Sequence, residues 1–377
     1  MTAHAGDAGN VTVDVRRGRT GRRRFALGLS LMPGPGLALL LLGLALGPYG
    51  LGLLTESVLA SLDPAMSVAL AALGVLVGLD VAVRTPRDGR SLVASIALVV
   101  TTMAIVAASV VIVERWSPGV ELSGWFLPAL LGLCAASSSI APDAAGDSRG
   151  TSAARIGTLG DLLLILLSMA ALAATHREPA AASALLVAKS ALIAVAIALA
   201  ALLLVTQTSA DGEQRVFAFG ALLLLGGAAA HLSLSALFTG LLAGVFWKVA
   251  GPPASEAIAR DVRYLQDPLI VLLLVVAGAR TPLSYGVAVL VAAYIVFRLV
   301  GRLIGAWLVS KTVIRETPVN LRSQLVAPGA VGIAIVLNVL QANPELDAAR
   351  TAFTVVVLGS VISELQALIV PRPDVDA

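Results

Sequence analysis

The sequence contains little charge and almost no cysteine. Only 13% of its 377 residues are Asp, Glu, Lys or Arg, whereas 58% are hydrophobic, and the mean hydropathy is +0.93. So few polar residues could not cover the surface of a water-soluble domain, which indicates an integral membrane protein. The single cysteine, Cys134, excludes an intrachain disulfide framework and a multi-cysteine metal cluster.

Nucleotide-binding motifs are missing as well. No GxGxxG unit follows a strand pattern and no P-loop is present, so neither NAD binding nor ATP hydrolysis is indicated. We therefore expect no cofactor and no enzymatic activity.

Long apolar runs make up most of the chain. A membrane-spanning helix needs about 20 apolar residues. The candidate spans are 27–48, 64–83, 91–113, 125–142, 156–175, 181–205, 215–230, 232–250, 265–280, 284–310, 321–341 and 351–370. The sequence thus predicts an all-α membrane protein with about twelve transmembrane helices. Asp267 and Pro268 are typical of a helix start and are predicted to begin the ninth span.

The basic residues are distributed unevenly. With both ends in the cytoplasm, the inner loops and tails carry 19 of the 26 Lys and Arg residues, and the outer loops carry only Arg115, Arg177, Arg280 and Arg350. This bias follows the positive-inside rule and predicts a multi-pass protein of the cell membrane with both termini cytoplasmic. Residues 1–24 form a basic tail ending in RRGRTGRRR, which we interpret as a topogenic signal and not as a nucleic-acid site. Residues 372–377 form the other tail.

Residues 134–172 carry the main functional feature. An apolar helix is interrupted at Ser137, Ser138 and Ser139, and the next apolar helix carries one acid, Asp161, about two turns in. A carboxylate within a membrane span costs roughly 2.5–3.5 kcal/mol on insertion scales and usually marks an ion or proton path. The alternative is a helix-end acid that snorkels to the inner surface.

Seven short stretches, in sequence order, resemble one family. They are LGPYGLGLL, ALAALGVLVGLD, AASSSIAPD, GTLGDLLLILL, LFTGLLAGVF, FRLVGRLIGAWL and APGAVGIAIVL. Together they are similar to the monovalent cation/proton antiporter superfamily, and most of all to its branch of bacterial sodium/proton and potassium/proton exchangers. The resemblance covers roughly residues 36–370. Because the chain stops at Ala377, we expect a twelve-helix form without the cytosolic nucleotide-binding domain of some relatives.

The resemblance implies a fold of two inverted-topology five-helix repeats, about 27–175 and 232–370, with linking helices in 181–230, in a transmembrane domain of residues 25–371. Segments 4 and 11 would be interrupted, at Ser137–Ser139 and at Pro328-Gly329, and would cross near the bilayer middle. Hydroxyl and carbonyl oxygens there suit an alkali cation; alternatively, the serines bond back to their own helix. A homodimer through a separate panel of helices is also implied.

The fifth segment of the family usually carries two adjacent polar residues, two aspartates or an asparagine and an aspartate. Here Asp161 matches the second position, which carries the proton and the cation in the family, and Gly160 leaves the first without a side chain. Arg302 matches a position where relatives hold a Lys or Arg that pairs with the site, and Arg298 shares its helical face. Because arginine stays protonated in proteins, its expected role is to offset a carboxylate and the ends of the interrupted helices. Snorkelling is the alternative.

Two further charged residues are candidates. At ~1.5 Å per residue, Asp161, Glu364 and Arg302 lie about 8, 10 and 12 Å from the inner ends of their spans. This common depth makes Glu364 the candidate partner of Arg302. Lys189 is expected to be a buried cation nearer the outer half of the bilayer, with a role in the outer cavity.

These observations predict a secondary antiporter that exchanges sodium or potassium for protons through competition at Asp161, one cation for one proton, with alternating access. Its partners would be the cation, protons and the lipid bilayer, and no nucleic acid. Two alternatives stay open: a non-transporting membrane subunit, suggested by Gly160, and an organic-anion transporter on an inverted-repeat scaffold, suggested by Arg298, Arg302 and Lys189. The choice between sodium and potassium, and whether the homodimer forms, are also open.

Overall fold

The computed structural model describes residues 35–84, 89–116, 124–137, 148–175, 180–207, 211–232, 234–251, 254–282, 287–312 and 329–369. These residues form helices joined by turns, and no strand occurs among them. The prediction of an all-α fold is confirmed.

The apolar helices fall into two length classes. Within the described residues, eight helices are long and apolar enough to cross a membrane: α4 (Asp63–Arg84), α5 (Gly89–Trp116), α7 (Ser148–Thr175), α8 (Ala180–Gln207), α9 (Asp211–His231), α11 (Ala254–Ala279), α12 (Ala288–Thr312) and α15 (Asp347–Ile369). Four are shorter: α2 (Pro35–Leu46), α6 (Phe126–Ala135), α10 (Ala236–Ala250) and α14 (Ala330–Ala342). Each predicted span corresponds to one of these helices. The short helix α3 (Glu56–Ser61) was not predicted.

The predicted start of the ninth span is wrong. Helix α11 begins at Ala254, and Pro268 lies inside it. The first half of α11 is amphipathic, since Ile258 and Val262 are buried whereas Arg263 is exposed. Packing of this apolar face offsets the backbone hydrogen bond that a proline removes from a helix interior.

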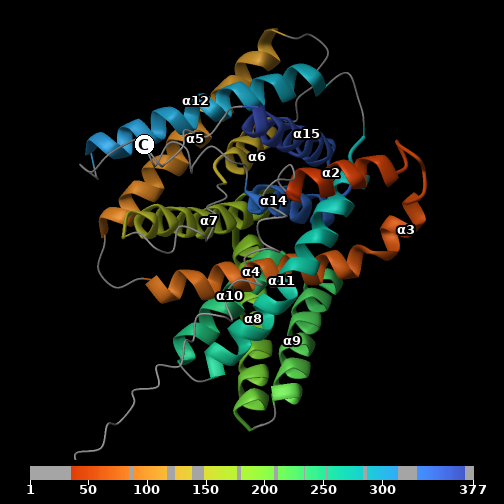
Figure 1. The fold of residues 1–377 in the computed structure, drawn as a ribbon, viewed down its shortest axis with the longest axis vertical. Helices are drawn as coiled ribbons and strands as arrows, with labels where there is room; N and C mark the ends of the chain where they lie inside the picture. The colour runs from red at the N-terminus through yellow and green to blue at the C-terminus, as the bar shows by residue number, and fades with distance from the viewer. Residues whose placement is uncertain are drawn as a thin grey trace, which may run out of the picture.

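The helices form two groups (Figure 1). Within each group the helices pack on one another. The first group consists of α5, α6, α7, α12, α14 and α15, and the second group consists of α2, α4, α8, α9, α10 and α11. In Figure 1 the first group fills the upper part of the view, and α4, α8, α9 and α10 fill the lower part. Between them, α7 and α14 of the first group contact α4 and α10 of the second.

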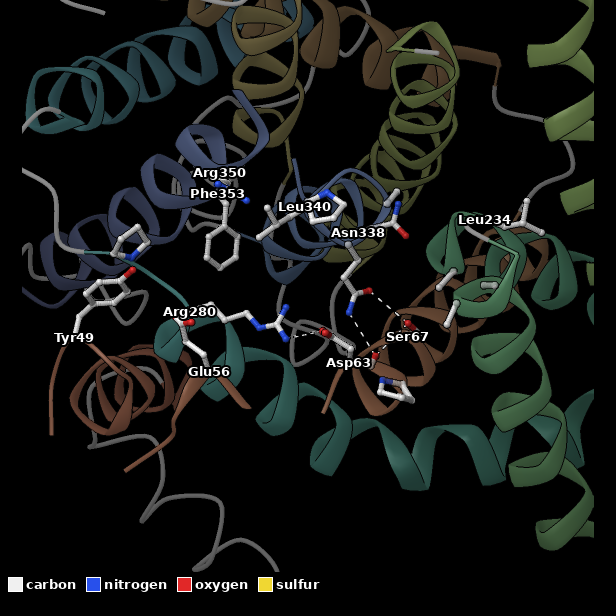
Figure 2. Close-up of a pocket in the computed structure, with 18 residues that line it drawn as sticks. Tyr49, Glu56, Asp63, Ser67, Leu234, Arg280, Asn338, Leu340, Arg350 and Phe353 are labelled. Atoms are coloured by element: carbon white, nitrogen blue, oxygen red, sulfur yellow. Dashed lines mark hydrogen bonds and ion pairs between the residues drawn. The ribbon is translucent and has the colours of Figure 1, made fainter. Parts of the chain in front are cut away.

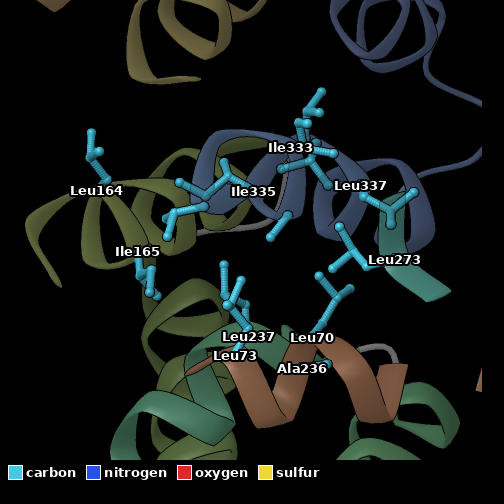
Figure 3. Close-up of a cluster of buried hydrophobic side chains, with 14 of the residues drawn as sticks. Leu70, Leu73, Leu164, Ile165, Ala236, Leu237, Leu273, Ile333, Ile335 and Leu337 are labelled. Carbon is cyan, nitrogen blue, oxygen red and sulfur yellow. The ribbon is translucent and has the colours of Figure 1, made fainter. Parts of the chain in front are cut away.

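An apolar layer joins the two groups. Large aliphatic side chains gather between α7 and α14 on one side and α4, α10 and α11 on the other (Figure 3), among them Ile165, Leu337, Leu70, Leu73, Leu237 and Leu273. Contacts of this kind are non-directional and exclude water. The layer is therefore a barrier to ions. Hydrogen bonds also join the groups beside it, because Asn338 of α14 donates to the Ser235 hydroxyl at 3.0 Å and accepts from the backbone N–H of Leu237 at 3.5 Å.

Glycines allow the closest helix contact of the second group. Gly74 and Gly78 on α4 face Gly240 and Gly244 on α10, and a Cβ atom on any of the four would overlap a backbone carbonyl oxygen of the other helix. In membrane proteins, small residues four apart let two helix backbones approach and gain van der Waals contact. The two small-xxx-small pairs thus explain why α4 and α10 pack so closely.

Gly240→Ala should destabilise the protein by about 1–3 kcal/mol, as overpacking of a filled interior does. The new methyl group would meet the carbonyl of Ala71, which cannot move without separating α4 from α10. Thermal unfolding of the purified protein in one detergent measures the effect. Gly220→Ala on α9, where a Cβ meets nothing within 4 Å, is the matched control. Equal melting temperatures for the two variants would contradict this packing.

Candidate functional site

Within the first group, the end of one short helix packs against the start of another. Helix α6 ends at Ala135, and α14 begins at Ala330 with Gly329 as its N-cap. A Cβ atom on Gly332 would lie 2.8 Å from the carbonyl oxygen of Cys134 and would overlap the hydroxyl of Ser137. The first turn of α14 therefore packs directly on the last turn of α6. This contact brings the partly negative C-terminal end of α6 beside the partly positive N-terminal end of α14.

The residues predicted at the two interruptions lie at this contact, as far as the structure describes them. Ser137 is buried, and its hydroxyl donates to the carbonyl of Cys134 at 2.9 Å, which is the back-bonding arrangement considered above. Gly329 starts α14 in an extended conformation. Ser138, Ser139 and Pro328 lie outside the described residues.

Two arginines of α12 bind the end of α6. Arg298 donates from Nε to the carbonyl of Ala135 at 3.2 Å and from Nη2 to that of Ser137 at 3.4 Å. Arg302 donates from Nε to Ala135 at 3.3 Å, and from Nη2 to Ala136 at 2.8 Å and to Ser137. Both side chains are buried, at 4% and 2% exposure. Neither snorkels to the surface, and their charges offset the negative end of α6.

Tyr294 belongs to the same face of α12 and was missed in the sequence. It lies one turn before Arg298 on the same helix and is buried, at 2% exposure. Gly359 of α15 makes room for the ring, because a Cβ there would approach Tyr294 to 2.6 Å. The spacing Tyr-x₃-Arg-x₃-Arg is the signal that could have found this residue.

Asp161 lies on α7, and its charge acts on Arg302. The side chain is partly buried, and its Oδ1 atom is shielded from solvent. The preceding residue, Gly160, is buried, and a Cβ built on it would lie 3.4 Å from the Ser95 hydroxyl and 3.7 Å from Val99, which are ordinary contacts. Asp161 thus lies within electrostatic range of Arg302, which binds the end of α6.

Glu364 has different neighbours from those predicted. Its carboxylate accepts a hydrogen bond from the backbone N–H of Leu37, and it lies 3.0 Å from a Cβ built on Gly36. These residues form the first turn of α2, where a negative charge is favourable. In the described part of the chain Glu364 therefore contacts α2 and not Arg302. Equal depth in the membrane does not fix the direction in which a side chain points.

Lys189 is exposed on α8, so the prediction of a buried cation is wrong. Helix α8 packs through the neighbouring face, which carries the buried residues Ser190, Ala194 and Ala198. Lys189 points away from that face, toward lipid or, if the predicted homodimer forms, toward a second copy of the chain.

A polar cavity of about 670 Å³ lies between the two groups (Figure 2). Its lining includes Asp63, Arg280 and Asn338, and Arg280 donates hydrogen bonds to Asp63 and to the carbonyl of Leu59. Asn338 lies nine residues after Gly329, or ~13 Å along α14. Leu337 of the apolar layer precedes it, so aliphatic contacts separate the cavity from the helix ends.

The cavity lies on the side that the charge distribution assigns to the outer face. Arg280 and Arg350, two of the four basic residues predicted in outer loops, both line it. Near the other end of α4, Asp80 pairs with Arg263 of α11 at 2.7 Å.

The chain matches known proteins by its structure and not by its sequence. No protein-family model and no curated protein matches the sequence. Among solved structures, the chain is similar to the sodium/proton antiporter MjNhaP1 from Methanocaldococcus jannaschii at pH 8, with 16% identity and a TM-score of 0.64 over 92% of this chain and 94% of that chain. The likeness extends over nearly the whole of both chains, and it shows that this multi-pass membrane protein has the fold of a sodium/proton antiporter.

Proposed function

We propose that this protein is a secondary antiporter that exchanges a monovalent cation, sodium or potassium, for protons. The observation that carries the proposal is the Asp161 carboxylate, which acts on Arg302 where the latter binds the end of α6. The fold shared with a sodium/proton antiporter supports it.

Competition at one carboxylate is the proposed mechanism. Deprotonated Asp161 is an anionic oxygen ligand, which suits an alkali cation, and protonation removes that charge. The fixed charge of Arg302 is present in both states, so loading a proton or loading a cation gives the site the same net charge. One cation is thus exchanged for one proton, because binding of either expels the other.

Alternating access would use the apolar layer between the groups. Its contacts are aliphatic and non-directional, so the first group can move against the second if the Asn338 bonds to Ser235 and Leu237 break or exchange. Such a movement would expose Asp161 first to one side of the membrane and then, through the polar cavity at Asn338, to the other.

The arginines favour a cation over an organic anion. Both guanidinium groups donate to carbonyls of α6, and a bound anion would have to compete with those bonds. Lys189, the third basic residue behind the anion alternative, is exposed on α8. These contacts support a role for Arg298 and Arg302 in holding the end of α6.

Asp161→Asn should abolish exchange, because the amide neither ionises nor releases a proton. The assay is dissipation of a pH gradient, followed with a dye in everted vesicles, on addition of sodium, potassium or lithium chloride. Asp80→Asn is the matched control, since Asp80 is exposed and paired with Arg263.

Exchange by the wild type would exclude the non-transporting alternative. Equal exchange by the wild type and Asp161→Asn would contradict the proposed mechanism.

Arg302→Gln should slow exchange about tenfold or more and lower the melting temperature, because carbonyls of α6 would lose their donor, at about 1–3 kcal/mol per unsatisfied buried group. Arg302→Lys should keep only part of the exchange rate and of the melting temperature, since one ammonium group cannot replace the planar set of guanidinium donors. Arg263→Gln, at an exposed ion pair, is the control and should change little. Wild-type exchange by Arg302→Gln would remove Arg302 from the site.

A further inference from the structure

Ser95 of α5 carries a buried hydroxyl that makes no hydrogen bond within the described part of the chain. Its exposure is 0%, and Oγ lacks a partner. Two other buried hydroxyls of α5 behave differently: Thr102 donates to the carbonyl of Leu98 at 2.9 Å and Ser109 to that of Val106 at 2.7 Å. Back-bonding of this kind is how hydroxyls in membrane helices are usually satisfied. Ser95 departs from this pattern, and a buried polar group without a partner calls for an explanation.

The hydroxyl lies next to the candidate site. Its Oγ atom is 3.4 Å from the position of a Cβ on Gly160, the residue before Asp161. Helix α5 also packs along α12, with Thr102 against Gly301 and Leu98 against Gly305. Arg302 follows the first of these glycines, and Ser95 lies about one turn from Leu98. Ser95 is therefore enclosed where α5, α7 and α12 meet.

A cluster of apolar side chains lies where these three helices meet. Ala94, Leu98, Ile156 and Ala306 form a small buried cluster from the same three helices. An alanine would satisfy these neighbours equally well and would leave no unpaired oxygen. A packing role alone thus accounts for a small residue here but not for its hydroxyl.

We propose that the Ser95 hydroxyl is a further oxygen ligand of the transported cation, beside the Asp161 carboxylate. This inference rests on the proposed antiport. Hydroxyl and carboxylate oxygens are the ligand types that hard cations prefer. Gly160 has no side chain, which leaves room for about one methyl group beside the Ser95 hydroxyl. Cation binding gives the Ser95 oxygen the partner that it lacks within the protein.

Two variants separate coordination from packing. Ser95→Ala removes the oxygen, and Ser95→Cys keeps the size of the side chain but replaces a hard oxygen with a soft sulfur, a poor ligand for sodium. Ser109→Ala is the matched control: it makes the same change on the same helix, at a buried hydroxyl bonded to its own backbone. Melting temperatures without sodium show that each variant is folded.

The first measurement is sodium binding, from the rise in melting temperature of the purified protein with sodium chloride against choline chloride at equal ionic strength. The second is the sodium concentration for half-maximal exchange. Ser95→Ala and Ser95→Cys should both need about five- to tenfold more sodium for binding and for half-maximal exchange, which is the change in affinity expected from the loss of one polar interaction. Their maximal exchange rates should stay within about twofold of the wild-type rate. Ser109→Ala should match the wild type.

The outcomes distinguish this inference from the antiport proposal. Wild-type sodium affinity in Ser95→Ala and Ser95→Cys, alongside an active wild type, would overturn the role of Ser95 alone. A normal Ser95→Cys with a weakened Ser95→Ala would assign Ser95 to packing. A wild type that neither binds nor exchanges sodium, potassium or lithium would overturn the antiport proposal and the Ser95 inference with it.

Discussion

The structure depends on how the protein satisfies the end of a helix that stops inside a membrane domain. The carbonyls of Ala135, Ala136 and Ser137 have no further helical turn to bond with, and hydrocarbon offers no donor. Arg298 and Arg302 supply the donors from α12. Other contacts serve this arrangement: glycines at 301 and 305 bring α12 close to α5, and Gly332 lets α14 approach α6.

This arrangement sets the charge at the candidate site. Two buried guanidinium groups exceed the partial charge of roughly half an electron at a helix end, so a carboxylate nearby is favourable, and Asp161 provides one. With the arginines engaged by backbone, the carboxylate is the group that can change its occupant. A site of one fixed positive cluster and one exchangeable anion would allow the proposed competition between a proton and a metal ion without a second acid, and so would be compatible with Gly160 at the preceding position.

Sequence reasoning found the spans, because apolar length can be read from one chain. It also singled out helix-breaking and charged residues, of which Ser137, Gly329 and Arg302 lie where α6 ends and α14 begins. It did not predict the directions in which side chains point. Glu364 has about the same predicted depth as Arg302 but points to α2, and Lys189 lies one residue away from the packed face of α8. Tyr294 and Ser95 look like ordinary residues of apolar helices until their neighbours are known. The start of α11 was missed because an amphipathic helix that packs on protein resembles a polar loop when only hydropathy is considered.

The most direct test of the account is proton release on cation binding. Sodium chloride is added to the purified protein in weakly buffered detergent solution, and released protons are measured with a pH dye against choline chloride. If proton and cation share Asp161, the wild type should release up to about one proton per chain at a pH near the midpoint of Asp161 protonation. Asp161→Asn should release none. Sodium binding without proton release at every pH, or equal release by both proteins, would contradict the shared site.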